Sequence, residues 1–508
     1  MKRSLIALAL LTALASTAAA QEPARQLTLK EAVRLAVQNN LDVRAELYNP
    51  ATAEAEIHKY EGIYNTSLSL LVNYQDSDTW PSYNGGTRLT ALKQTTTAYN
   101  AALTQLMPSG GTVEASFNNS LHHSNYQTVD NFDNYFQSDF TLNLTQPLLK
   151  NFGRETTELN INVAKFNKQG ALEQFKARLL DIVAQVKTQY FQLYDLREKL
   201  KVNEASLRLA QVILKNTQSQ FKAGVLPAFE ILNAKFGLAA QQKNLIDAKR
   251  AVVDQVDTLR LLLQLHDTSD IIPVDKPFNN KYLLDEEREI KRALTERPDL
   301  KEQRTALKTT ELQYKIARNR VRPDLSLLTS ASFTGLADGY NRDLEHVGSG
   351  SYPIWSVGLQ LTYPLGNDAA KNDFIMSKLK VAQSRTQIRS LEEQIVKEVR
   401  TAVRGVRSTY LSLDVTAKGR SYADEVLQAY IKKQQAGLAT TKDVLDVLNN
   451  EIAAKANEIQ AVVDYNDAIV TLWKTTGELL KREGIKLDVN QADTLYAQSA
   501  SSVLKVKD

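Results

Sequence analysis

The sequence contains two copies of one pattern, and this duplication constrains the possible folds more than any other feature of the chain. Short segments recur in the same order in both halves. The matched segments, first copy with second, are 41–44 with 298–301, 67–69 with 324–326, 145–148 with 362–365, and Ala223-Gly224 with Ala436-Gly437. The first copy holds an additional segment around Pro108-Ser109-Gly110-Gly111, a strong turn signal. An extra hairpin and a long surface loop are the two interpretations of that segment.

The duplication predicts a division of the chain into five parts. These are a signal peptide (1–20), a first structural repeat (21–266), a linker (267–287), a second structural repeat (288–483) and a polar tail (484–508). The tail is aperiodic, and no role is predicted for it.

The N-terminal segment has the composition of a secretory signal peptide. Lys2 and Arg3 provide the positive start, a short apolar run covers 5–14, and Ala18-Ala19-Ala20 offers a cleavage site before Gln21. The apolar run is too short to cross a bilayer as a permanent helix, and an uncleaved anchor is the alternative. Export from the cytoplasm is therefore predicted.

Composition excludes several classes of protein. The chain has no cysteine, which rules out a disulfide framework, a thiolate zinc site and a cysteine nucleophile. The formal net charge of +4 gives no electrostatic reason to expect a nucleic-acid partner. No segment after the signal approaches the run of about 18 apolar residues that a membrane-spanning helix needs.

Six segments alternate in side-chain character and predict strands. They are 66–76, 97–106, 112–118, 136–146, 325–335 and 354–363, separated by polar stretches such as 77–87 and 335–351 that suit external loops. Such strands are about as long as a tilted strand that crosses a bilayer. A soluble sheet with one wet face would show the same alternation.

The rest of each repeat predicts two very long helices. From Leu172 to Phe221, apolar residues recur at alternating steps of three and four, which is coiled-coil periodicity. A helix over 154–222 would be about 100 Å long at 1.5 Å per residue. We expect each repeat to form an antiparallel helix pair that reverses at Ala223-Gly224 or Ala436-Gly437, since glycine permits the turn at a helix end.

With these features in place, the chain resembles the TolC-like outer-membrane efflux protein family over essentially its whole mature length. The resemblance rests on four motifs: 27–32 (LTLKEA), 146–149 (QPLL), 151–154 (NFGR), and Ala436-Gly437 followed by 443–446 (DVLD). It implies a mixed α and β fold in which a homotrimer forms an outer-membrane β-barrel, with four strands per subunit and twelve in all. The barrel would continue into an α-helical coiled-coil tunnel in the periplasm of a Gram-negative bacterium.

The resemblance also implies partners and a function. Family members are channel components of tripartite efflux pumps or type I secretion systems, and they work with a periplasmic adaptor and an inner-membrane transporter. Outer-membrane lipid would surround the barrel. The alternatives are a periplasmic structural coiled-coil protein and a surface adhesin, in which the sheet would not contact lipid on every strand.

Three carboxylates are candidates for a periplasmic gate. Asp443 and Asp446 lie three residues apart and so project from one helix face. In the family, the matching carboxylates line the closed entrance, and three copies would form rings that attract cations. Glu230 takes the equivalent place in the first repeat. The alternative interpretation is that these acids stabilise a helix N-terminus.

The two helix-reversing turns are the candidate adaptor-docking surface. Their residues are Ala223, Gly224, Ala436 and Gly437. No catalytic constellation, cofactor motif or metal-ligand spacing is recognisable, and His122-His123 is interpreted as a solvated pair in a polar loop. The sequence therefore predicts a channel and not an enzyme, with an undetermined substrate.

Overall fold

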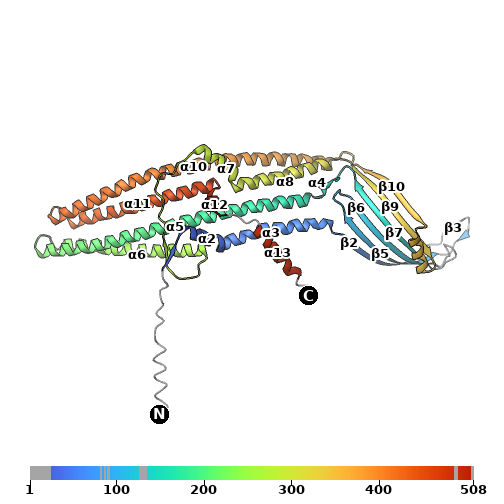
Figure 1. The fold of residues 1–508 in the computed structure, drawn as a ribbon, viewed down its shortest axis with the longest axis horizontal. Coiled ribbons are helices and arrows are strands. Elements are labelled where there is room, and N and C mark those ends of the chain that lie inside the picture. The colour runs from blue at the N-terminus through green and yellow to red at the C-terminus, as the bar shows by residue number, and fades with distance from the viewer. Residues whose placement is uncertain are drawn as a thin grey trace, which may run out of the picture. The chain divides into compact units, whose positions relative to one another are not determined.

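The computed structural model describes residues 24–79, 83–84, 87–88, 92–124, 134–485 and 490–504 (Figure 1). The predicted signal peptide, 1–20, lies outside these ranges. The chain forms two compact units. The strand unit comprises Pro50–Leu172, Glu302–Arg389 and the residues from Asn490 onward, and the helical unit comprises the residues up to Asn49, Glu173–Lys301 and Ser390–Val489.

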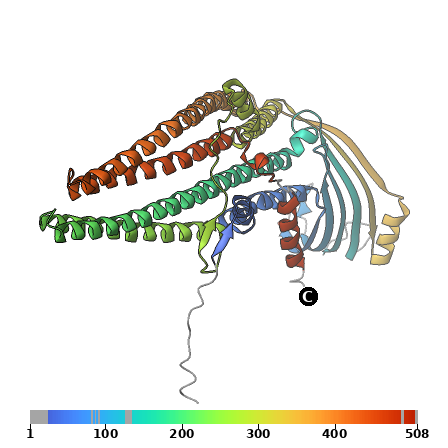
Figure 2. The same cartoon turned by 60° about the vertical axis from the view of Figure 1, so that its left-hand side comes forward.

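The strand unit contains one antiparallel six-stranded sheet, and it includes all six strands that alternation predicted. The strands are β2 (Ser67–Thr79), β5 (Leu92–Leu106), β6 (Thr112–Ser124), β7 (Asn134–Pro147), β9 (Asp324–Ala337) and β10 (Pro353–Thr362). Their order is β10-β9-β7-β6-β5-β2, which leaves β10 and β2 as the two edges (Figure 1). The sheet is curved along its strands (Figure 2). A separate small pair joins β3 (Tyr83–Asn84) to β4 (Thr87–Arg88).

The strand count corrects the expectation of four strands per subunit. By the matched segments of the two repeats, β2 corresponds to β9 and β7 corresponds to β10. The hairpin β5–β6 is therefore the additional segment of the first repeat. Its turn is closed by a hydrogen bond from the Met107 N–H to the Gly111 carbonyl (2.7 Å). Gly110 has a φ of +89°, a conformation that favours glycine.

The strand register separates an apolar face from a polar face. Residues paired across antiparallel strands share a face. One face carries Leu68, Leu70 and Val72 of β2; Tyr99 and Leu103 of β5; Ala115 and Phe117 of β6; Phe140 and Leu142 of β7; Ala331 and Phe333 of β9; and Trp355, Val357, Leu359 and Leu361 of β10. The opposite face carries mainly Ser, Thr, Asn, Gln and a few charged residues, such as Glu114 and Asp139.

Helix α9 (Tyr340–Ser349) covers part of the apolar face, at the loop ends of β7 and β9. The buried Asp343 of α9 accepts hydrogen bonds from the backbone N–H and the hydroxyl of Ser138. Ser138 is a polar residue on the apolar face, and these bonds satisfy its two donors. Gly335 lies directly beneath α9, where any Cβ would fall 2.2 Å from the Asp343 carbonyl oxygen. The predicted loop over 335–351 is thus corrected to a helix between two short connections.

The helical unit is built on two long antiparallel helix pairs (Figure 1). The first is α5 (Leu159–Lys222) with α6 (Phe229–Leu263), and the second is α10 (Asp368–Gln435) with α11 (Thr441–Thr475). The helix predicted over 154–222 is confirmed, apart from a break after α4 (Arg154–Thr157). Within the described residues, no helix is both long and apolar enough to cross a membrane.

The core of the helical unit lies where α5, α6 and α11 meet shorter elements. These are β1 (Arg25–Leu27), α2 (Leu29–Asn39), β8 (Ile271–Pro273) and α12 (Leu479–Arg482), and helix α7 (Glu286–Glu296) follows β8 along the chain. Strands β1 and β8 pair in parallel, so the predicted linker 267–287 contributes a strand. Tyr190 of α5 is fully buried against this strand pair, and its hydroxyl donates to the Leu27 carbonyl (2.8 Å).

The remaining helices lie wholly or partly in the strand unit. They are α3 (Leu41–Glu61), a short 3₁₀ turn (Gly62–Tyr64), α8 (Pro298–Arg320) and α13 (Asn490–Leu504). Helix α13 lies within the predicted polar tail, 484–508, where no periodic pattern indicated a helix. Lys168 of α5 donates to Asp493 of α13 (2.7 Å), and the rings of His58 and Tyr496 stack at 4.9 Å.

Candidate functional site

The ends of the two long helix pairs bring together the residues that the sequence predicted as functional. Each reversal begins with a glycine in the left-handed region: Gly224 has a φ of +75°, and Gly437 has a φ of +72°. A Cβ at either position would meet no atom within 4 Å, so the backbone conformation and not crowding requires glycine. The predicted turns at Ala223-Gly224 and Ala436-Gly437 therefore lie where helices α5 and α10 end.

Hydrogen bonds close both turns in the same way. The N–H of Val225 donates to the Gln220 carbonyl (2.9 Å), and the N–H of Leu438 donates to the Lys433 carbonyl (2.8 Å). This six-to-one pattern satisfies carbonyls at a helix end. The side chains of Val225 and Leu438, one residue beyond each glycine, are exposed. The tips thus present apolar side chains on a hydrogen-bonded turn.

Asp443 caps the start of α11. Its carboxylate accepts hydrogen bonds from the Thr440 N–H (2.9 Å) and hydroxyl (2.7 Å), and the Thr440 hydroxyl accepts from the Asp443 N–H (3.1 Å). This reciprocal pair is a capping box. The hydrogen bond from the Thr440 hydroxyl is the largest cause that lowers the pKa of Asp443. The carboxylate is therefore ionised and exposed while it stabilises the helix.

Asp446 lies one turn further along α11 and is also exposed. The opposite face of the helix is buried through Val444, Leu445 and Leu448, which pack with Ile213 of α5 and Leu427 of α10. This packing holds the carboxylates of Asp443 and Asp446 on the outer face of α11, away from the core of the tip.

Glu230 has a different environment from the one that its sequence position predicted. Its side chain is only 3% exposed, and a carboxylate oxygen accepts a hydrogen bond from the Thr441 N–H (3.0 Å). Glu230 belongs to α6 and Thr441 begins α11, so the first repeat caps a helix of the second. In this chain Glu230 joins the two helix pairs and does not project from the tip.

Replacing Glu230 with Ala is expected to loosen the tip. The change leaves the Thr441 N–H without its acceptor, which costs about 1–3 kcal/mol for a buried group. Amide hydrogen exchange should therefore quicken over 441–445. Glu230→Gln keeps an acceptor of similar shape and serves as the matched control. Equal exchange in the wild type and Glu230→Ala would show that this hydrogen bond does not hold the tip.

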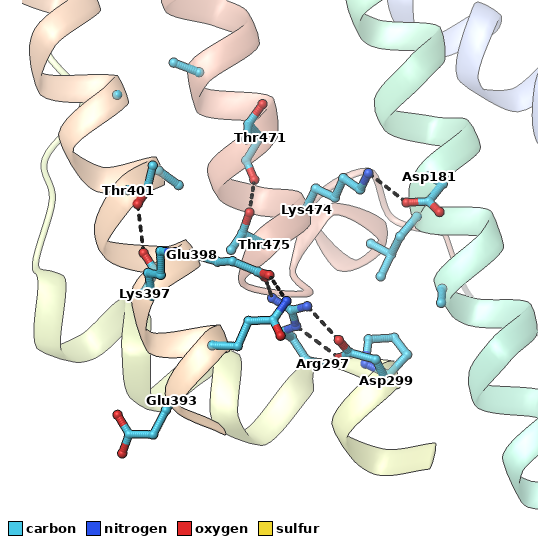
Figure 3. Close-up of a pocket in the computed structure, with 17 residues that line it drawn as sticks. Asp181, Arg297, Asp299, Glu393, Lys397, Glu398, Thr401, Thr471, Lys474 and Thr475 are labelled. Carbon is cyan, nitrogen blue, oxygen red and sulfur yellow. Dashed lines mark hydrogen bonds and ion pairs between the residues drawn. The ribbon is translucent and has the colours of Figure 1, made fainter. Parts of the chain in front are cut away.

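A large open hollow lies elsewhere in the helical unit, among α5, α10, α11 and the junction of α7 with α8 (Figure 3). Its volume is about 1230 Å³. Arg297 points toward Asp299 (2.6 Å) and Glu398 (2.5 Å), and Lys474 pairs with Asp181 (2.8 Å). Each of these two basic residues is thus paired with at least one acid. Among the lining residues that the structure describes, no nucleophile is paired with a base.

The two adjacent histidines lie in a strand and not in a loop. His122 and His123 belong to β6, and the ring of His122 stacks on Tyr135 at 4.7 Å. Among the residues that the structure describes, no group of three or more potential ligands could hold a metal ion.

Two apolar seams of the helical unit escaped the sequence analysis. Helix α6 exposes Phe229, Leu232, Phe236, Ile246 and Val253, and helix α10 exposes Leu411, Val415, Tyr422 and Val426. The spacing within each set follows steps of three, four and seven residues, apart from one step of ten between Phe236 and Ile246, and such steps align residues on one side of a helix. Neither seam is covered by other residues that the structure describes. Burial within one chain cannot be read from periodicity alone, which is why these positions were not recognised.

The structure thus combines a sheet that has one exposed apolar face with long helix pairs that carry exposed apolar seams. A family model described as outer membrane efflux protein matches residues 90–264 and 290–478. The chain belongs to this family, and it is an outer-membrane protein. The family resemblance drawn from the motifs is confirmed.

Individual relatives are distant in sequence. The pyoverdine export outer membrane protein OpmQ of Pseudomonas aeruginosa is 22% identical over 326 residues, which are 61% of this chain and 65% of that protein. The match thus spans slightly less than two thirds of that relative.

Solved structures share the fold over nearly the whole chain. The outer-membrane channel OprN superposes with a TM-score of 0.65 at 15% identity, covering 88% of this chain and 89% of that one. The CmeC outer membrane channel of Campylobacter jejuni superposes with a TM-score of 0.62 at 15% identity, covering 92% and 89%. The MtrE outer membrane channel of Neisseria gonorrhoeae, in its open state, superposes with a TM-score of 0.58 at 16% identity, covering 91% and 90%.

Proposed function

We propose that three copies of this chain form an outer-membrane channel that serves as the passive exit duct of an efflux pump or type I secretion system. A periplasmic adaptor and an inner-membrane transporter would deliver the substrate. The observation that carries this proposal is the sheet of the strand unit, which is apolar on one face and polar on the other across all six strands. Lipid on one side and water on the other require this division.

The exposure of the apolar face distinguishes the channel from the alternatives. A soluble cap on a coiled coil, or an adhesin head, would bury its apolar face in its own core. Here Leu70, Trp355 and Leu359 are each about two thirds exposed or more. The open edges β2 and β10 carry unpaired backbone groups that hydrocarbon does not tolerate, so neighbouring copies must pair with them.

The helical unit supports assembly in a second, independent way. The apolar seam on α6 and the one on α10 are both uncovered in the single chain. Exposed apolar patches of this kind mark protein interfaces. We assign the two seams to contacts between adjacent copies, in which coiled-coil packing would continue from one subunit to the next.

The tips would form the periplasmic entrance. Three copies of Asp446, together with three capping carboxylates of Asp443, would line a constriction that attracts cations. The turns at Ala223, Gly224, Ala436 and Gly437 would dock the adaptor, with the exposed side chains of Val225 and Leu438 providing apolar contact.

Reconstitution tests the proposed function directly. Protein extracted from outer membranes should migrate as an SDS-resistant trimer and should form ion channels in planar bilayers. A water-soluble monomer that forms no channels would overturn the proposal.

Replacing Asp446 with Asn should weaken block of the channel by a trivalent cation added from the periplasmic side. Removal of three charges at a constriction should raise the half-blocking concentration about tenfold, the change that 1.4 kcal/mol of binding free energy produces. Asp414→Asn is the matched control, because Asp414 is exposed on α10 outside the tips and pairs with Lys418. Unchanged block in Asp446→Asn would exclude this residue from the entrance.

A further inference from the structure

The sheet of the strand unit carries an inference about the barrel itself, and this inference rests on the proposed trimeric channel. Hairpin β5–β6 is inserted between two strands that have counterparts in the second repeat. It does not leave the sheet as a loop. Strand β5 pairs with β2 over Leu92–Thr104, and β6 pairs with β7 over Thr112–His123.

The inserted strands carry the same two faces as the rest of the sheet. Leu103 of β5 lies between Leu68 and Ala115 on the apolar face. Its neighbour Ala102 lies between Ser69 and Ser116 on the polar face. A strand that is apolar on one face and polar on the other is suited to a barrel wall between lipid and water. A strand in a loop or plug does not require this alternation.

Both edge strands of the sheet, β2 and β10, can pair with a strand of another copy. Every residue of β10 is exposed, and apolar residues reach the edge strands at Val72 and Val357. Neither edge strand has an internal proline or lysine, the residues that commonly protect a free edge. The sheet has an even number of antiparallel strands, so β2 of one copy and β10 of the next would also be antiparallel.

We propose that the barrel contains eighteen strands, six from each of three copies, and that it closes through antiparallel pairing of β2 with β10 of the adjacent copy. This differs from the twelve strands that the family resemblance implied. With strands about 4.8 Å apart and tilted about 40°, the backbone diameter would be about 36 Å, against about 24 Å for twelve strands. Measured between backbones, the barrel would therefore be about 1.5 times as wide at equal tilt, which leaves the tips as the narrow part of the passage.

Spin labels on single cysteines test whether the hairpin is part of the barrel wall. The natural chain has no cysteine, so each introduced thiol is unique. In trimers reconstituted in lipid, dissolved oxygen, which partitions into lipid, should accelerate the spin relaxation of a label at Leu103→Cys. A water-soluble nickel chelate should accelerate the spin relaxation of a label at Ala102→Cys. Leu142→Cys and Asn143→Cys provide the same pair of positions on β7, a strand that both repeats share.

Disulfide trapping tests the closure. Val72→Cys combined in turn with Val357→Cys, Leu359→Cys or Leu361→Cys should give, for at least one pair, covalent trimers that a reductant separates. If the channels conduct and the label at Leu142→Cys lies in lipid, but the label at Leu103→Cys does not, the eighteen-stranded barrel is overturned. The proposed channel function would then still stand. Failure of all three cysteine pairs in conducting trimers would overturn the β2–β10 closure. Absence of channels together with a water-exposed Leu142→Cys label would overturn the proposed function itself.

Discussion

A Val357→Arg variant is expected to be lost from the outer membrane as an assembled trimer. Val357 lies in the middle of β10 on the apolar face, opposite Thr329, and is 62% exposed. An arginine near the bilayer midplane destabilises a barrel by about 2–4 kcal/mol. Three copies would therefore suffer about 6–12 kcal/mol in total, which is comparable with the whole stability of many proteins. The measurement is the amount of SDS-resistant trimer in washed outer membranes.

Ser356→Arg provides the control for this prediction. Ser356 precedes Val357 in the same strand and lies opposite Ser330 on the polar face. An arginine there would face water inside the channel, so the trimer should persist and only the ion selectivity of the channel should shift. Similar loss of trimer in both variants would show that the two faces of the sheet do not separate lipid from water.

Local patterns were sufficient to predict the strands and the long helices. The segment predicted over 354–363 is β10 (Pro353–Thr362), and the segment predicted over 325–335 lies inside β9 (Asp324–Ala337). Side-chain alternation reports a strand because successive residues point to opposite faces. Glycine at a helix end likewise predicts a turn, because the turn requires a positive φ that glycine adopts readily.

Contacts between distant residues could not be predicted in this way. Alternation identified strands in the inserted hairpin but did not determine whether they join the main sheet, because pairing depends on partners elsewhere in the chain. The hydrogen bond between Glu230 and Thr441 joins residues 211 positions apart. No spacing within either repeat indicates it, so the prediction for Glu230 rested on its equivalence to Asp443 and on the family resemblance.

One feature of the tip was within reach of the sequence. Thr440 followed three residues later by Asp443 resembles the capping-box pattern, in which a hydroxyl and a carboxyl side chain each accept from the other's backbone N–H. The helix-start interpretation of Asp443 therefore describes its contacts within the chain. Exposure of the same carboxylate is compatible with the proposed entrance, so the two roles do not compete.

Replacing Tyr190 with Phe is expected to destabilise the helical unit. The Tyr190 hydroxyl donates to the Leu27 carbonyl and accepts from the backbone N–H groups of Val274 and Asp275 (3.0 Å each). Burial is the main cause that raises the pKa of Tyr190 to about 12, so the hydroxyl keeps its proton at neutral pH. Removal of this oxygen leaves the Asp275 N–H without an acceptor, at about 1–3 kcal/mol where water cannot reach it. The Leu27 carbonyl and the Val274 N–H each lose one of two partners and keep their mutual hydrogen bond (3.1 Å).

The destabilisation should begin at the paired strands β1 and β8. Both flank Tyr190, and Asp275 also accepts a hydrogen bond from the Leu29 N–H (2.6 Å) at the start of α2. We expect a lower thermal midpoint by circular dichroism, and faster amide exchange over 25–29 and 271–275. Tyr465→Phe is the comparison, since its hydroxyl satisfies the Asn280 carbonyl and the Tyr282 N–H (2.8 Å each), and Asn280 is exposed, so water can replace a lost bond there. A loss of stability in Tyr465→Phe as large as that in Tyr190→Phe would show that the access of water to the freed backbone groups does not determine the effect.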